Sequence, residues 1–298
     1  MVAERAIARS ISRPVREQII RGRGCGRVLA RFEHACDVVT RRGSVIAVAT
    51  GRVGDGPLNI VLSAEESPFA GVEAGAQVLW DRGLLWLDGM EIDVREAAVW
   101  EPRVDWGALR HQRATISSSL ASPASLFRAH TSGSVFSTFL GADGPTDPFG
   151  RAVLNRARDA LEDLRDGWDG SLPALLRGGG ELAGLGSGLT PAGDDFLVGL
   201  MLWAWLAHPA PRPFCQVLSE AAASRTTVLS TAFLRAAAWG LCSAPWHYLL
   251  AALGKGPKAD IPSALRAVAG CGATSGADAL CGFLFLSLRQ PVAAHLPQ

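Results

Sequence analysis

The stretch Leu84-Leu-Trp-Leu-Asp-Gly-Met-Glu-Ile-Asp-Val94 is the clearest structural signal in this sequence. Asp88-Gly89 stands between two short runs in which apolar residues recur at every second position. An Asp-Gly pair in this setting is typical of the tight turn of a β-hairpin. We therefore expect two antiparallel strands here, at 84–87 and 90–94.

Short runs of the same kind precede this hairpin and are separated by glycine-bearing turns. They cover residues 27–32, 44–49, 58–62 and 77–80. Roughly six strands with period-two alternation predict a small β-barrel or sandwich over residues 26–105. Residues 1–25 carry six arginines and lack the apolar core of a signal peptide, so we interpret them as a basic N-terminal segment.

Beyond Trp106 the apolar residues recur at three- and four-residue spacing, which indicates helices. An amphipathic helix is expected from about 149 to 164. Further helices are expected near 194–207, 214–224, 226–240, 244–253, 260–269 and 277–288. We interpret 106–150, rich in Ser, Gly and Pro towards its end, as a connecting region and 151–298 as a helical domain. The expected fold class is α+β, with a small β-barrel or sandwich followed by a mostly helical domain.

Composition narrows the functional classes. The chain is 48% hydrophobic and 19% charged, a composition that excludes a disordered protein. Its net charge is +1, so no strong positive electrostatic field would attract nucleic acid. Its longest apolar run, Phe196–Ala207, is well short of the ~20 residues that cross a bilayer. The six cysteines form no C-x-x-C pair, so neither a zinc site nor a disulfide framework is indicated. We expect a cytoplasmic protein without membrane partners.

A glycine-rich segment, Gly184-Leu-Gly-Ser-Gly-Leu-Thr-Pro-Ala-Gly-Asp-Asp195, leads into that apolar run. Its glycines permit backbone conformations closed to other residues and leave amide groups uncovered. Thr190-Pro191 is typical of a helix start, which places Asp194 and Asp195 in the first turn. One carboxylate there stabilises the helix dipole by about 0.3–1 kcal/mol without any function. The second, adjacent carboxylate adds repulsion and favours a functional role.

A second segment repeats this pattern. Gly193-Asp-Asp-Phe-Leu-Val-Gly-Leu200 aligns with Gly276-Ala-Asp-Ala-Leu-Cys-Gly-Phe283. In both, a helix opens with Gly-x-Asp and carries a glycine four residues after the Asp, on the same face. Two such helices that cross near their starts bring Asp195 and Asp278 towards one site. Chance similarity and plain helix capping remain alternatives.

The segment Ser224-Arg-Thr-Thr-Val-Leu-Ser230 precedes a third helix, and Thr274-Ser275 precedes Gly276. Arginine and hydroxyl groups at helix starts are suited to binding phosphate or carboxylate. The catalytic candidates are therefore Asp194, Asp195 and Asp278. The anion- or substrate-binding candidates are Gly186, Ser187, Gly188, Thr190, Gly193, Arg225, Thr226, Thr227, Thr274, Ser275 and Gly276.

These three segments resemble the signatures of a bacterial family long known as a domain of unknown function. They read Gly184-Leu-Gly-Ser-Gly-Leu-Thr-Pro-Ala-Gly-Asp-Asp195, Arg225-Thr-Thr-x-Leu-Ser230 and Gly272-x-Thr-Ser-Gly-x-Asp278. Its best-understood relatives are the H-type subunits of oxamate carbamoyltransferase, in purine (allantoin) degradation. The resemblance implies phosphorolysis of oxalurate to oxamate and carbamoyl phosphate, together with companion subunits in an oligomer. Ala273 departs from the pattern, where a polar residue such as His or Ser is expected.

Carbamoyl transfer needs a place for a phosphate group and donors that polarise a carbonyl. The amides of 184–193 and Arg225 are suited to this, and Asp194 and Asp195 to orienting an amide nitrogen or holding Mg²⁺. The expected ligand is a small anion such as carbamoyl phosphate or oxamate. Two alternatives stay open: a metal-dependent hydrolase that uses the three Asp residues, and a non-catalytic assembly subunit.

Overall fold

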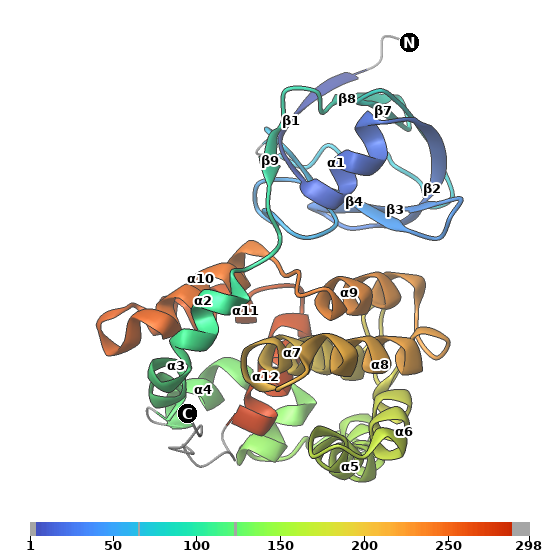
Figure 1. The fold of residues 1–298 in the computed structure, drawn as a ribbon. Helices are drawn as coiled ribbons and strands as arrows, with labels where there is room; N and C mark the ends of the chain where they lie inside the picture. Colours follow the sequence, from blue (N-terminus) through green and yellow to red (C-terminus); the bar gives the residue numbers. More distant parts are fainter. Residues whose placement is uncertain (1–3, 65, 122–123, 288–298) are drawn as a thin grey trace. The chain divides into compact units, whose positions relative to one another are not determined.

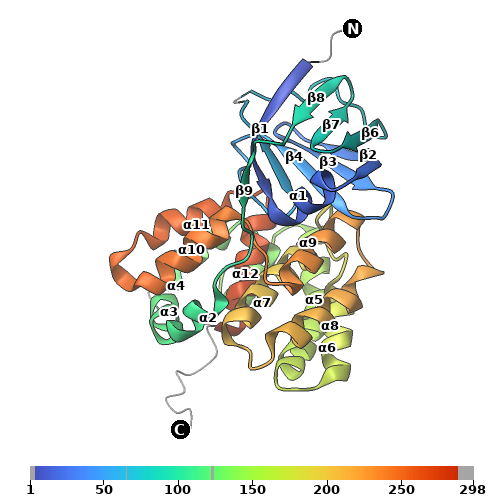
Figure 2. The same ribbon diagram turned by 45° about the horizontal axis from the view of Figure 1, so that its top comes forward.

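The structure, a computed structural model, describes residues 4–64, 66–121 and 124–287. These divide into two compact units (Figures 1 and 2). The first comprises the described residues up to Arg103 with Cys242–Ala244, and the second comprises Val104–Leu241 with the described residues from Pro245 onward. Each unit is considered by itself below.

The first unit is a β-barrel of mixed strand direction. Its strands are β1 (Glu4–Ser12), β2 (Arg23–Arg31), β3 (Ala35–Thr40), β4 (Val45–Ala49), β5 (Asn59–Leu62), β6 (Gln77–Asp81), β7 (Leu84–Leu87), β8 (Met90–Asp93) and β9 (Ala98–Trp100). Eight of them follow the order β5-β4-β3-β2-β6-β7-β8-β1, and pairing of β1 with β5 closes the ring. The expected barrel or sandwich is thus a barrel, in which β4–β5 and β1–β8 run parallel.

The predicted hairpin is confirmed at its turn. Asp88 and Gly89 have φ values of 44° and 83°, the left-handed conformation that a two-residue turn between twisted strands requires. Arg82-Gly83 makes an equivalent turn between β6 and β7, with φ of 45° and 89°. Side chains on β6 to β8 alternate between the barrel interior and the outside, which is the pattern that the sequence analysis used.

Residues 4–25 differ from the expectation of a separate basic segment. They form β1, α1 (Arg13–Ile20) and the start of β2, and Figure 1 shows α1 within the outline of the strand ring. Val15 and Ile19 on α1 belong to the barrel core. On β1 the buried positions include Ala8 and Ser10, so the strand presents small residues inward and arginines outward. Ile11 is the large apolar residue among the buried positions Ala8, Ser10, Ile11 and Ser12, so β1 lacks the repeated large apolar residues of the other strands.

The second unit is built from helices. They are α2 (Trp106–His111), α3 (Arg113–Leu120), α4 (Ala124–Thr131), α5 (Pro148–Trp168), α6 (Leu172–Leu182), α7 (Ala192–Ala207), α8 (Pro211–Ala223), α9 (Val228–Ala238), α10 (Ala244–Lys255), α11 (Ile261–Ala269) and α12 (Ser275–Ser287), with short 3₁₀ turns η1 (Val135–Leu140) and η2 (Gly256–Lys258). Both views show α7 and α12 in the middle, between α5, α6 and α8 on one side and α3, α4, α10 and α11 on the other. Within the described ranges, no helix is long and apolar enough to cross a membrane.

Two parts of this unit differ from the sequence analysis. Residues 106–140 contribute α2, α3, α4 and η1 to the helical unit rather than a loop between two domains. Helix α6 was not expected, because three consecutive glycines, Gly178 to Gly180, lower helix propensity. These glycines permit close packing: a methyl group on Gly178 would lie 2.7 Å from the carbonyl oxygen of Ala160 on α5, and one on Gly179 would lie 2.9 Å from Leu218 on α8.

Candidate functional site

Helices α7 and α12 cross through a reciprocal pair of glycines. A methyl group on Gly199 would lie 1.7 Å from the carbonyl oxygen of Ala279, and one on Gly282 would lie 1.8 Å from that of Phe196. Each helix therefore presses a glycine against the backbone of the other, four residues after its own Asp. The repeated Gly-x-Asp pattern thus corresponds to two helices that contact each other reciprocally at equivalent positions.

The first glycine of each pattern, Gly193 or Gly276, fixes a helix start against the preceding helix. A methyl group on Gly193 would lie 2.1 Å from the carbonyl oxygen of Leu182, and one on Gly276 would lie 1.9 Å from that of Val268. Their amides donate to backbone carbonyls, that of Leu185 at 2.8 Å and that of Cys271 at 2.9 Å. Because these amides are already bonded, packing accounts for both glycines.

The starts of the two helices meet directly. The hydroxyl oxygens of Thr190 and Ser275 lie 3.0 Å apart. The loop before α7 contains three glycines with positive φ values, Gly184 at 71°, Gly186 at 123° and Gly188 at 91°. Residues with a side chain rarely adopt these conformations, as expected from the sequence. Ser187 at the tip of this loop is exposed.

Asp194 is a fully partnered buried carboxylate that ties two of the three segments together. One oxygen accepts the Gly184 amide at 3.0 Å, and the other accepts the hydroxyl of Thr226. Its side chain is 1% exposed, and burial raises its pKa while both hydrogen bonds oppose that shift. This geometry fits a residue that holds the glycine-rich loop against the segment before α9.

We expect Asp194→Ala to destabilise the fold by about 1–3 kcal/mol, because it leaves the partly buried Gly184 amide and Thr226 hydroxyl without an acceptor. Asp195→Ala is the matched control, since one oxygen of that neighbouring carboxyl has no partner to lose. Chemical denaturation of both variants measures the difference. A loss for Asp194→Ala no larger than that for Asp195→Ala would contradict the structural role of Asp194.

Asp195 is also buried, but unlike Asp194 it has one carboxyl oxygen without a partner. It is 8% exposed, and its Oδ2 atom has no hydrogen-bond partner. Burial raises its pKa to about 8, the hydroxyls of Ser275 and Thr190 oppose the shift, and the nearby carboxylates of Asp278 and Asp194 add to it. Asp195 is therefore largely protonated at neutral pH, as expected of a buried carboxyl beside other carboxylates.

Asp278 occupies the equivalent position on α12. It is 1% exposed, its Oδ1 atom accepts the Ser134 hydroxyl at 2.5 Å, and its Oδ2 atom has no partner. Burial raises its pKa to about 6, against hydrogen bonds from Ser134 and Thr274. Two adjacent buried carboxyls thus each present one oxygen without a partner. Such an atom inside a native fold calls for a ligand, a water molecule or a catalytic role.

Ser134 was missed by the sequence analysis. It also caps η1, accepting the Phe136 amide at 3.0 Å. A serine followed by the largely apolar run 135–140 is an available sequence signal for that cap. Nothing in the sequence indicates that the same hydroxyl bonds an Asp that lies 144 residues further along the chain.

The segment before α9 lies at the site, but its arginine side chain is engaged elsewhere. Thr227 caps α9, and its hydroxyl donates to the Leu189 carbonyl at 2.6 Å. Arg225 donates to the carbonyl of Gly180 at 3.3 Å and to the carboxylate of Glu181 at 3.2 Å, on an exposed surface. The structure thus brings together Thr190, Thr226, Thr227, Ser275 and the three Asp residues, while the Arg225 guanidinium forms its ion pair with Glu181.

A metal centre receives no support from the geometry. Within the described ranges, no group of three or more His, Cys, Asp or Glu side chains is arranged to hold a metal ion. Asp194 already uses both oxygens for hydrogen bonds. The neighbours that favour the charged form of Asp195 are hydroxyl groups.

Comparison with protein families matches both halves of the chain. Residues 182–287 match the family model described as oxamate carbamoyltransferase subunit AllH, and residues 6–99 match the AllH family N-terminal domain. This chain belongs to the AllH family. The first match spans the end of α6 through α12, including the three segments of the site, and the second spans nearly the whole barrel. No solved structure matches the chain.

AllH membership confirms the resemblance that the three segments suggested. It implies a subunit of oxamate carbamoyltransferase, and a subunit implies companion subunits. Ser134 lies outside both matched regions, although its hydroxyl bonds a carboxylate inside one of them.

Proposed function

We propose that this AllH chain contributes the acid–base group for carbamoyl transfer between oxamate and phosphate, with Asp195 as the catalytic residue and Asp278 as its positioning residue. The observation that carries the proposal is the pair of buried carboxyls at the junction of α7 and α12, each with one unpartnered oxygen. Asp195 is assigned the chemical step because it keeps 8% exposure, against 1% for Asp278.

The reaction needs one proton at the leaving nitrogen. In phosphorolysis of oxalurate, a phosphate oxygen attacks the carbamoyl carbon and the C–N bond to the oxamate nitrogen breaks. That nitrogen leaves as a neutral amide only when it gains a proton, and protonated Asp195 is suited to donate it. The resulting carboxylate regains a proton from the attacking hydrogen phosphate, so protons and electrons balance. In the reverse direction Asp195 accepts the amide proton while oxamate attacks carbamoyl phosphate.

The raised pKa suits this role. A carboxyl with an ordinary pKa is ionised at pH 7 and donates no proton, whereas the environment of Asp195 raises its pKa to about 8. The nearby Asp278, whose own pKa burial raises to about 6, adds to the shift of Asp195 through charge repulsion. Asp195 therefore holds its proton at neutral pH and releases it above about pH 8.

We further propose that the loop containing Gly186, Ser187 and Gly188 binds the anionic end of the substrate, with Thr190 and Ser275 beside the reacting group. Supporting this, the loop adjoins both helix starts, and its glycines adopt conformations that leave the backbone open to a ligand. Asp194, Thr226 and Thr227 then act by positioning that loop. The paired Arg225 binds the substrate only if its ion pair with Glu181 opens.

The experiment is reconstitution. Because the chain is one subunit, the purified chain alone should show little carbamoyl transfer, companion subunits alone should also show little, and the mixture should restore turnover. Oxamate formed from oxalurate and phosphate is the readout. Full turnover by companion subunits without this chain would rule out the proposed catalytic role and support the non-catalytic assembly alternative.

A further inference from the structure

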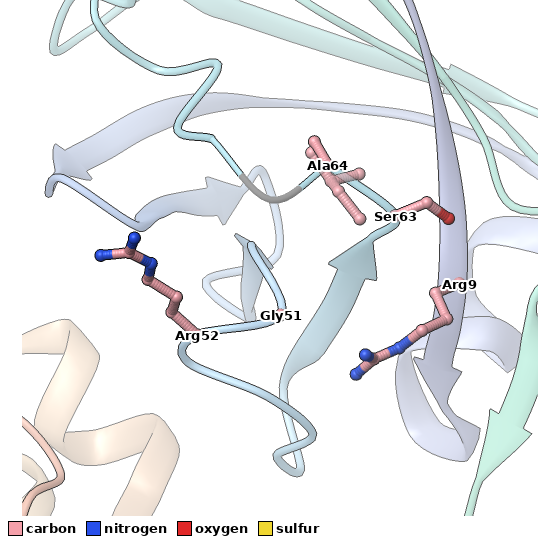
Figure 3. A pocket seen from close by; sticks show the side chains of 6 residues that line it. Arg9, Gly51, Arg52, Ser63 and Ala64 are labelled. Carbon is pink, nitrogen blue, oxygen red and sulfur yellow. The ribbon is translucent and has the colours of Figure 1, made fainter.

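A hollow of about 440 Å³ lies in the barrel unit. Its described lining residues are Arg9, Gly51, Arg52, Leu62, Ser63 and Ala64 (Figure 3). Strands β4 and β5 run parallel, so the residues that follow them, Gly51-Arg52 and Ser63-Ala64, emerge at the same edge of the barrel. Strand β1 pairs with β5, with Ala8 opposite Leu62, and this brings Arg9 to the same edge.

The hollow gathers hydrogen-bond donors without acceptors of opposite charge. Arg9 is exposed, and its guanidinium has no hydrogen-bond or ion-pair partner among the described residues. Arg52 lies across Gly51 from Arg9 in Figure 3, with one guanidinium nitrogen 3.5 Å from the His34 ring. In the described part of the chain, the backbone amides of Gly51 and Arg52 likewise have no partner.

In the sequence Glu65 and Glu66 directly follow Ala64. Among the described residues, no carboxylate forms an ion pair with Arg9 or Arg52. Asp55, three residues after Arg52, accepts the Ser10 hydroxyl at 2.5 Å, and Ser10 is buried on the opposite face of β1 from Arg9. Glu33 lies 3.4 Å from the His34 ring. None of the lining residues that the structure describes is acidic. Among the described residues, the two guanidinium groups beside the hollow therefore have no carboxylate partner.

We propose that this hollow binds a small anion with a phosphate or carboxylate group. Arg9 is its principal ligand, and Arg52 and the Gly51 amide are further donors. Arginine presents a fork of N–H groups that matches the two oxygens of such an anion. A volume of about 440 Å³ is that of a small-molecule site, which favours a metabolite over a peptide segment. The site is separate from the Asp195–Asp278 cluster, which lies in the helical unit.

Calorimetric titration of the full chain with inorganic phosphate, and separately with oxamate, tests this site and distinguishes the two anion chemistries. Arg9→Gln should weaken binding of the accepted anion by about 10-fold or more, the scale of a lost charge-assisted hydrogen bond. Arg42→Gln is the matched control, because Arg42 is an exposed arginine in the turn after β3, outside the hollow.

Amide hydrogen exchange locates the bound anion independently. The anion should slow exchange at residues 50–54 in the wild-type chain and not in Arg9→Gln. Binding that Arg9→Gln and Arg42→Gln weaken equally would reflect net charge alone and would overturn the proposal. Protection of residues 184–190 instead of 50–54 would assign the anion to the helical unit. If neither anion binds and an acidic peptide does so in an Arg9-dependent manner, the small-molecule assignment is wrong.

Discussion

Asp195→Asn should lower oxalurate phosphorolysis by the reconstituted complex by about 10²–10⁴-fold, the usual contribution of a positioned general acid–base group. An amide has nearly the shape of a protonated carboxyl, and Asp195 is protonated below about pH 8. The substitution therefore keeps the packing and removes the transferable proton. Stability and assembly should stay close to those of wild type.

The control for this prediction is another buried carboxyl outside the cluster. Asp37 on β3 is 5% exposed, and burial raises its pKa to about 6. Asp37→Asn should leave turnover within about 2-fold of the wild-type value, because a pKa raised by burial does not by itself make a carboxyl catalytic. Equal losses from Asp195→Asn and Asp37→Asn would indicate a general structural effect and remove the catalytic assignment.

Gly199→Ala should lower the free energy of unfolding by about 3 kcal/mol, the upper end of the range for overpacked cores. The added methyl group would lie 1.7 Å from the carbonyl oxygen of Ala279, which is helix backbone and cannot rotate aside. Relief requires α7 and α12 to separate, and their separation would also part Thr190 from Ser275. Turnover should therefore fall together with stability.

Gly180→Ala is the matched substitution within a helix. The atoms nearest to a methyl group there belong to the Arg225 guanidinium, at 3.3 Å, the far end of a flexible side chain. Replacing a helical glycine by alanine otherwise gains up to about 1 kcal/mol. Chemical denaturation should show Gly180→Ala as neutral or stabilising. If Gly199→Ala costs no more than Gly180→Ala, the close crossing of α7 and α12 is wrong.

The sequence predicted those elements whose local pattern agrees with their final environment. Strands β6 to β8 alternate large apolar residues, and Asp88-Gly89 marks their turn, so the hairpin was recognisable. Strand β1 was not, because its inward positions include Ala8 and Ser10, which are small or polar. Helix α6 was hidden by glycines whose purpose is contact with α5 and α8, a tertiary reason that no local pattern reveals.

In the candidate site, too, local spacing was predictable from the sequence and long-range contacts were not. Gly-x-Asp with a glycine four residues later predicted the crossing of α7 and α12, because that spacing alone defines one helix face. The roles within the site needed coordinates. Asp194 and Asp195 are adjacent and chemically identical, yet one is bonded on both oxygens and the other on one side only. The Arg225–Glu181 ion pair and the bond from Ser134 to Asp278 depend on long-range packing.

The pH dependence of phosphorolysis tests the central claim most directly. The pKa of Asp195 is raised to about 8, so the proton-donating form is present below that pH and lost above it. At saturating oxalurate and phosphate, turnover by the wild-type complex should therefore fall as the pH rises through about 8. The residual activity of the Asp195→Asn complex should lack this decline. If both complexes lose activity over the same pH range, the titrating group is not Asp195 and the proposed proton donor is wrong.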